Sequence, residues 1–168
     1  DGFGITIHGS GDRFLLDGEV TQAIGQMLAR AGMTVNGVET LPYSVFAPGA
    51  GNGEYAAFLF SYGNSTGEAG RGLSSLFHSY APEINLGTLN RFRYSSAEFD
   101  DLVYEALSEF DWPRREELLQ QSTELALLHD TAIIPLYHQS LAWAARTGLR
   151  VVPRKDERTV AMSIHIVE

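Results

Sequence analysis

The first third of the chain alternates between extended and helical patterns of apolar positions. Residues 3–8 alternate as a strand does, and residues 9–13 form a loop rich in glycine and polar residues. Asp17 is expected to cap a helix that ends at Gly32. Its apolar face consists of Val20, Ala23, Ile24, Met27, Leu28 and Ala31. Extended character returns over residues 33–41, so we expect a βαβ unit with a parallel pair of strands.

The middle of the chain predicts a strand between two stretches rich in turn-forming residues. Residues 42–53 are rich in Gly, Pro, Ala and Asn, which favours a short helical turn followed by a loop. Residues 54–62 contain a short apolar run that is typical of a buried strand. Residues 63–72 then form a long polar loop. Because loops that follow strands in α/β proteins often bind ligands, this loop is a candidate site.

The second half predicts two amphipathic helices. Ser95 and Glu98 have the spacing of a capping box. The apolar stripe that follows consists of Phe99, Leu102, Val103, Ala106, Leu107 and Phe110. Asp111 is expected to cap the next helix, with Pro113 in its first turn. The acidic residues of this half fall mostly on the polar helix faces, so we interpret them as solvated rather than as a calcium site or a catalytic pair.

The remaining residues predict extended segments. Residues 131–139 contain Pro135, which favours an edge strand or a bulge. Residues 141–152 and 159–167 are further extended segments, joined by the charged stretch 154–158. We therefore expect the chain to end in strands.

Composition and charge limit the possible classes of protein. The chain has 168 residues, 44% of them hydrophobic, which is enough for one compact domain over residues 1–168. Its 21 acidic and 12 basic side chains give a net charge of -9, which argues against binding to nucleic acid. The absence of cysteine excludes disulfides, thiolate metal sites and cysteine nucleophiles. The chain begins without Met directly before a strand, so we expect a piece of a longer protein.

Motifs for metal, phosphate or nucleophilic chemistry are weak. The five histidines lack metal-ligand spacing, and the glycine-rich residues 49–54 precede a strand instead of opening a helix. Ser10 lies between two glycines but lacks the frame of a nucleophile elbow. A small α/β hydrolase or transferase that uses the loop from Gly9 to Arg13 is the alternative function.

The loop after the third predicted strand carries side chains suited to a polar small molecule. Tyr62 offers an aromatic ring, Asn64 an amide, Ser65 a hydroxyl and Glu68 a carboxylate. An ordinary connecting loop explains the same composition equally well, so both interpretations stay open on the local pattern.

The order of segments resembles that of a known family. Residues 90–100 contain Asn90, Tyr94, Glu98, Phe99 and Asp100 in the spacing of a signature of oligopeptide- and dipeptide-type (family 5) solute-binding proteins of bacterial ABC importers. Further agreeing positions in both halves are Asp12, Arg13, Phe14, Val20, Gln22, Ala23, Gly32, Val35, Asp111, Arg115 and the run from Leu127 to Tyr137. The resemblance therefore covers nearly the whole chain.

The resemblance implies an α/β fold that forms one lobe of a two-lobed periplasmic binding protein (type II-like), with a mixed sheet flanked by helices. The chain would be the C-terminal ligand-binding lobe of a longer protein, and residues 141–168 a tail that crosses the hinge. Implied partners are a small solute or short peptide, the importer's membrane permease and the missing N-terminal lobe. A periplasmic location, no catalysis and no cofactor are also implied.

The resemblance also identifies ligand-facing residues and one departure. The family's ligand loop has an aromatic residue followed by an aspartate that pairs with a peptide's ammonium group. Tyr62 keeps the aromatic position, whereas Ser65 stands where the aspartate is expected, and a hydroxyl cannot supply a charge-assisted bond to an ammonium group. We predict that Tyr62, Asn64 and Ser65 face the ligand, with Glu68 and Arg13 behind them.

Overall fold

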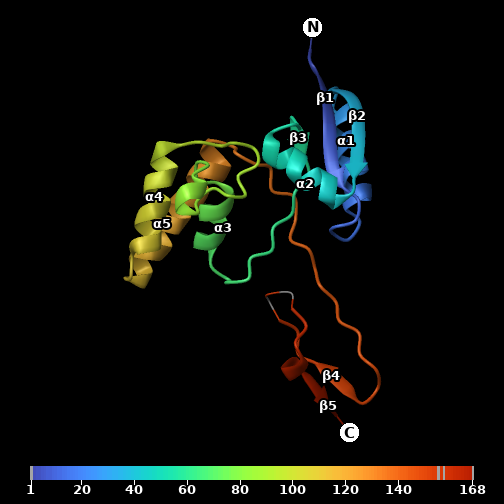
Figure 1. Cartoon of the computed structure of the whole chain (residues 1–168), viewed down its shortest axis with the longest axis vertical. Helices are drawn as coiled ribbons and strands as arrows, with labels where there is room; N and C mark the ends of the chain where they lie inside the picture. The colour runs from blue at the N-terminus through green and yellow to red at the C-terminus, as the bar shows by residue number, and fades with distance from the viewer. Residues whose placement is uncertain (1, 155, 157, 168) are drawn as a thin grey trace.

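The protein is described by a computed structural model that covers residues 2–154, 156 and 158–167. Figure 1 shows an α/β unit, a helical unit beside it, and an extended tail that ends in a small hairpin away from both. Predictions that involved Asp1, Lys155 and Glu157 lie outside the described residues. The α/β class predicted from the sequence is confirmed.

The predicted βαβ unit is present. Strand β1 (Gly4–Ser10), helix α1 (Asp17–Arg30) and strand β2 (Thr34–Leu41) follow one another, and the two strands pair in parallel. Strand β3 (Ala57–Phe58) adds to the other side of β1, also in parallel, so the sheet order is β2-β1-β3. The strand predicted over residues 54–62 is therefore much shorter than expected, because only its centre pairs with β1.

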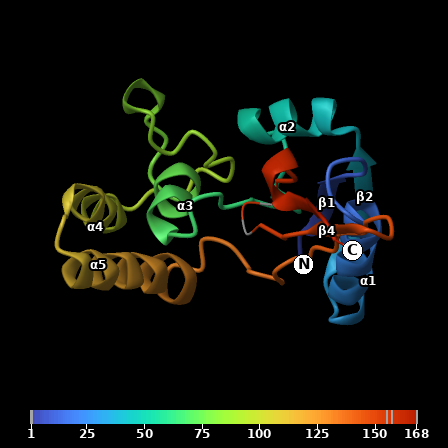
Figure 2. The same cartoon turned by 90° about the horizontal axis from the view of Figure 1, so that it is seen from below.

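The two faces of β1 pack against different helices, which lie on opposite sides of the sheet in Figure 2. Ile7 is directed to α1, where a Cβ on Gly25 would clash with the Val38 side chain, so glycine allows the close approach of helix and sheet. His8 stacks on Tyr55, which in turn stacks on Phe46 of α2 (Tyr43–Asn52).

Helix α2 replaces the turn and loop that the sequence predicted there. Its two glycines and Pro48, which lies inside the helix, disfavour a helix intrinsically. However, Phe46 and Ala50 are buried on one side of it, and the burial of this face stabilises a helix that local composition alone does not.

The helical unit has a contiguous hydrophobic core. The unit consists of α3 (Ala69–Leu76), the short helix η1 (Pro82–Ile84), α4 (Ala97–Ser108), and α5 (Trp112–Glu124) with its continuation η2 (Leu125–His129). The buried core residues are Leu73, Leu76, Phe77, Phe99, Val103, Ala106, Leu118, Leu119 and Ala126. The loop predicted over residues 63–72 is shorter than expected, because α3 begins at Ala69.

The helix caps confirm one prediction and correct two. Asp111 caps α5 by accepting a hydrogen bond from the backbone N–H of Arg114 at 3.2 Å. Helix α4 is capped by Ser96 instead of Ser95, whose hydroxyl lies 2.9 Å from that of Ser79. Asp17 is the first residue of α1 and not its cap.

The predicted strand over residues 131–139 is wrong, since no strand occurs among residues 131–148. A strand needs a neighbour that accepts and donates its backbone hydrogen bonds, and this segment has none in the described part of the chain; Ile134 is 77% exposed. Beyond it, β4 (Leu149–Val151) pairs antiparallel with β5 (Ile164–Ile166), which follows the short helix η3 (Ala161–Ser163). Parallel and antiparallel pairs therefore occupy separate sheets.

Candidate functional site

The carboxyl ends of the three parallel strands gather at one edge of the sheet. Residues 11–16 follow β1, helix α2 follows β2, and residues 59–68 follow β3. The carboxylate of Asp12 accepts a hydrogen bond from the backbone N–H of Tyr43 at 2.7 Å, which joins the first two of these connections. Ligands of open parallel sheets characteristically bind at this edge, so the geometry directs attention to it.

Asp17 shapes the loop after β1. Its buried carboxylate, only 4% exposed, accepts hydrogen bonds from the Ser10 hydroxyl at 2.7 Å and from the backbone N–H groups of Arg13 and Phe14 at 3.1 Å. Burial acts to raise the pKa of Asp17, but these hydrogen bonds outweigh it and the pKa is lowered. A charged Asp17 therefore holds the loop, and the Arg13 side chain is left exposed.

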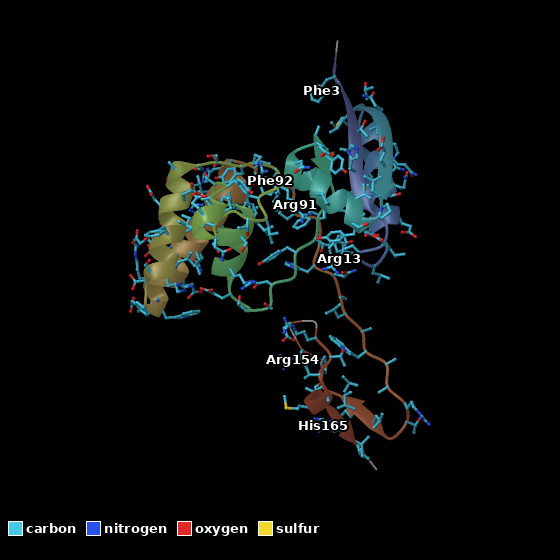
Figure 3. The ribbon with its side chains drawn as sticks, in the orientation of Figure 1. Phe3, Arg13, Arg91, Phe92, Arg154 and His165 are labelled. Carbon is cyan, nitrogen blue, oxygen red and sulfur yellow. The ribbon has the colours of Figure 1, made fainter. Side chains whose placement is uncertain are left out.

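Two guanidinium groups lie at the carboxyl edge, one from each unit of the chain. The Arg13 guanidinium lies 5.1 Å from the ring centre of Tyr43, and that of Arg91 lies 4.8 Å from the ring centre of Phe60. Figure 3 shows Arg13 and Arg91 close to each other where the α/β and helical units meet. We call Arg13, Tyr43, Phe60 and Arg91 the carboxyl-edge cluster.

Asn90 positions Arg91. The Asn90 side chain is fully buried. Its amide NH2 donates to the carbonyl oxygens of His78 at 2.9 Å and Tyr94 at 2.7 Å. Its amide oxygen accepts from the backbone N–H of Tyr94 at 3.1 Å. These bonds close the loop of residues 90–94. The asparagine of the recognised signature thus has a structural role, and the arginine beside it reaches the cluster.

The cluster is rich in positive charge. Burial acts to raise the pKa of Tyr43, but the guanidinium groups of Arg91 and Arg13 outweigh it, and the pKa of the phenol is lowered. Among the described residues, neither Arg13 nor Arg91 forms an ion pair with a carboxylate. The Nη1 atom of Arg91 is buried and has no hydrogen-bond partner within the described chain.

The polar side chains of the loop after β3 are mostly engaged within the protein. The Asn64 amide donates to the carbonyl oxygen of Glu68 at 2.7 Å, and its oxygen accepts from the Thr66 hydroxyl at 2.8 Å. The Glu68 carboxylate accepts from Nε of Arg115 at 2.6 Å in a partly buried ion pair. Asn64 and Glu68 therefore shape the loop and fasten it to α5.

The other two residues predicted on this loop differ in environment. Tyr62 is half-buried and packs against the core of the helical unit. Ser65 is exposed at the tip of the loop, where its side chain is accessible to a ligand. The structure thus brings Tyr62, Asn64, Ser65 and Glu68 together on one loop and places Arg13 on another.

Sequence reasoning missed Tyr43, Phe60 and Arg91. Tyr43 lies two residues after the strand predicted over residues 33–41, which was a usable signal. Nothing in the sequence joins Arg91 to Phe60, about thirty residues before it. Two surface hollows have none of the four cluster residues in their lining. One lies over α1 and Thr40, and the other between residues 67–69 and α5.

The alternative of a nucleophilic site at the loop from Gly9 to Arg13 is not supported by the geometry. Gly9 and Ser10 belong to β1, and Ser10 is 2% exposed with its hydroxyl donated to Asp17. A nucleophile must reach its substrate and have a base at hydrogen-bond distance.

No group of three potential metal ligands occurs in the part of the chain that the structure describes. Of the helices in that part, none has both the length and the apolar character to span a membrane.

Comparison with solved structures identifies the fold. The chain is similar to the DppA periplasmic binding protein of Helicobacter pylori in complex with the peptide STSA (24% identity, TM-score 0.63, 74% of this chain and 23% of that one). It is also similar to OppA of Burkholderia pseudomallei (16% identity, TM-score 0.70, 100% and 32%). NikA of Staphylococcus aureus in complex with Ni(L-His)2 is a third example (14% identity, TM-score 0.63, 74% and 25%).

These structures are longer than this chain, which spans about a quarter to a third of their length. No protein-family model matches the sequence, and the search of curated proteins gave no significant match. The similarity confirms the predicted fold: the chain folds like part of these two-lobed periplasmic binding proteins.

Proposed function

We propose that this chain, whose fold is that of part of an ABC-importer binding protein, is a ligand-binding lobe that captures a small polar solute without chemical turnover. The fold carries the proposal, because the solved structures that share it are binding proteins for peptides and for a nickel complex. The carboxyl edge of the sheet supplies the ligand surface of this lobe, with Arg13 and the loop of residues 62–68 on it.

The rest of the binding site belongs to a second lobe in this proposal. The chain spans only part of the similar structures, so a longer protein would supply an N-terminal lobe that closes against the carboxyl edge. Residues 141–168 would cross the hinge between the lobes, which fits the long extended segment that leaves the helical unit (Figure 1). The closed form would deliver its solute to a membrane permease from the periplasm.

The class of solute stays open between a peptide and another small polar molecule. Ser65 cannot pair with a peptide's ammonium group as an aspartate does. Glu68 is engaged by Arg115 and is not free to replace it. Peptide binding through this loop would therefore depend on groups outside it.

The test is solute binding by the complete gene product that contains these residues. Small-angle X-ray scattering and intrinsic fluorescence are measured against di- and tripeptides, sugars and nickel–histidine complexes. We expect one class to lower the radius of gyration, as lobe closure requires. If every solute leaves both the radius and the fluorescence unchanged, the proposed function is wrong.

Two matched variants test the loop. Tyr62→Phe keeps the ring that packs on the helical core and removes only the hydroxyl, and Tyr104→Phe makes the same change at an exposed position on α4. If Tyr62 faces the solute, Tyr62→Phe weakens binding while Tyr104→Phe does not. Equal affinities for Tyr62→Phe, Ser65→Ala and the unmodified protein would remove this loop from the site.

A further inference from the structure

We propose that a hollow beside α5 binds a basic segment of a partner protein, with Trp112 as the aromatic contact and Glu116 and Glu124 as the pairing charges. The hollow lies between residues 67–69 and α5, and we call it the α5 hollow. This interaction is separate from the proposed function, because no residue of the carboxyl-edge cluster lines the hollow.

One face of α5 forms a wall of the α5 hollow. The lining residues on the helix are Trp112, Glu116, Leu119, Gln120, Thr123 and Glu124. Their spacings of three and four residues place them along one side of the helix. Leu119 is buried, whereas Trp112, Glu116 and Glu124 are exposed. The hollow therefore combines an apolar base with carboxylates that reach solvent.

An ion pair holds the opposite wall. Glu68 lines the hollow, and its carboxylate accepts a hydrogen bond from Nε of Arg115 on α5 at 2.6 Å. This pair fastens residues 67–69 to the helix, so the wall is in place before a partner arrives. Glu116 and Glu124 form no ion pair within the described part of the chain. Their charges are therefore available to a partner.

Trp112 is the aromatic member of the hollow. Its side chain is 61% exposed at the start of α5, between the cap Asp111 and Pro113. The cap and the proline begin the helix, which needs no aromatic ring at this position. Phe110, two residues earlier, is 99% exposed. Tryptophan is enriched among the residues that contribute most to protein interfaces, so exposed rings beside a hollow favour a protein partner.

Charge selects the class of partner. An apolar partner would remove water from Glu116 and Glu124 without replacing their hydrogen bonds, which is costly. A second copy of this chain, with its net charge of -9, would bring the same carboxylates to a symmetric contact, and like charges repel. A Lys or Arg side chain instead pairs with a carboxylate, and its cation is attracted to the Trp112 ring. Its methylene stem can rest on Leu119.

The spacing of the two carboxylates favours a protein segment over a single small cation. Glu116 and Glu124 lie on the same helix at a separation of about 12 Å along its axis. One guanidinium group cannot pair with both carboxylates at that separation. In an extended segment, basic residues four positions apart are separated by about 13 Å, which matches the carboxylates.

The α5 hollow belongs to a part of the molecule that lobe closure would not cover. In both Figure 1 and Figure 2, α5 begins on the side of the helical unit that faces away from the α/β unit. The proposed function places the second lobe against the carboxyl edge of the sheet. A partner at the α5 hollow would therefore not compete with that lobe.

The experiment titrates the 168-residue chain with the capped peptide Arg-Ala-Leu-Ala-Arg and follows the tryptophan indole N–H signals by NMR. The chain has two tryptophans. Trp143, in the tail, donates its indole N–H to the Thr159 hydroxyl at 3.1 Å and serves as the internal reference. We expect a saturable shift of the Trp112 signal and none of the Trp143 signal. Trp112→Phe identifies which signal is which.

Matched probes test the chemistry of the partner. The same peptide with citrulline in place of arginine keeps the shape and loses the charge, and it is expected not to bind. N-acetylarginine amide supplies a single cation and is expected to bind about fivefold more weakly or worse, because it forms one ion pair in place of two. If either probe binds as tightly as the basic peptide, the inference is wrong.

Variants assign the binding to the hollow, with affinities measured by calorimetry. Glu116→Gln and Glu124→Gln are each expected to weaken peptide binding about two- to fivefold, as the loss of an exposed ion pair predicts. Trp112→Ala is expected to weaken it about tenfold. Glu19→Gln makes the same change of charge at an exposed position on α1 and is expected to leave binding unchanged. Equal weakening by Glu19→Gln would attribute binding to the net charge and overturn the inference.

Other occupants of the hollow are outcomes of the same set of measurements. Sedimentation of the chain without peptide is expected to show a monomer. A dimer that Trp112→Ala dissociates would place a second copy in the hollow and overturn the inference. Loss of peptide binding in the complete gene product would show that another part of the protein covers the hollow, with the same consequence. None of these outcomes bears on the proposed function, which is tested by closure on a solute.

Discussion

The loops that follow β1 and β3 leave the same edge of the sheet, yet they use their polar side chains in opposite ways. In the loop after β1, Asp17 lies beneath the loop and holds its backbone, so the side chain of Arg13 is exposed. In the loop after β3, Asn64 and Glu68 belong to the loop and are engaged by its backbone and by Arg115.

The difference teaches that a polar side chain in a loop serves either the shape of the loop or the ligand. Hydrogen-bonding capacity used within the protein is not available outside it. Recognition therefore requires a supporting residue elsewhere, which the first loop has in Asp17. In the second loop, Ser65 is the exposed polar residue among those predicted to contact a ligand.

Asp17→Ala should have the largest effect on this comparison. It removes a buried acceptor from the Ser10 hydroxyl and three backbone N–H groups, with an expected loss of about 3 kcal/mol in the free energy of unfolding. Urea unfolding measures this loss. Since the folded pKa is lowered, the stabilisation is present above the unfolded pKa near 3.8 and is lost as pH falls below it. Equal stability of Asp17→Ala and the unmodified chain at pH 7 would contradict this role.

Glu68→Gln should lower stability less, by about 1–2 kcal/mol, because the ion pair with Arg115 is partly buried and the amide can still accept a hydrogen bond. Glu116→Gln, at an exposed position on α5, is the matched control and should change stability little. Both variants are compared by urea unfolding. A stable Glu68→Gln protein with weakened solute binding would instead place Glu68 in the ligand site.

Tyr94 gives a pH-dependent control in the helical unit, away from both loops. Burial and the hydrogen bond from its hydroxyl to Asp130, at 2.6 Å, raise the pKa of Tyr94 to about 12. Stability from the neutral phenol should be complete below the unfolded pKa of about 10 and be lost as pH rises through about 12. Unfolding measured across this range should show the loss in the unmodified chain and not in Tyr94→Phe. An identical pH dependence of the two would refute the assignment.

Ser65→Ala should have the smallest effect on stability, within about 0.5 kcal/mol, because the side chain is exposed. Thermal unfolding measures it. A larger loss would show that Ser65 supports the loop as Asn64 and Glu68 do. The polar side chains Asn64, Ser65 and Glu68 would then all serve the shape of this loop.

Regions with strong local signals were predictable from the sequence. The alternation in residues 3–8 and the apolar stripe of α1 predicted the βαβ unit, and the Asp111 cap with Pro113 predicted the start of α5. Each of these signals acts within one turn or one strand, so no distant residue is needed to interpret it.

Predictions failed where a distant neighbour decides the outcome. The apolar residues 131–139 do not form a strand, because no strand of the described residues pairs with them to complete the hydrogen bonds. Similarly, Phe110 continues the apolar stripe of α4 in sequence but is 99% exposed, because it lies beyond the end of the helix.

The sequence by itself determined the α/β class, the order of the main elements and the resemblance to solute-binding proteins, since these depend on periodicity and on short motifs along the chain. Only the tertiary structure decided which polar groups are available to contact a ligand. It engaged Glu68 with Arg115 across a long stretch of sequence, and it brought Arg91 to the edge where Arg13 and Tyr43 lie. Burial and hydrogen-bond partners are properties of the space around a side chain, and the linear pattern does not contain that space.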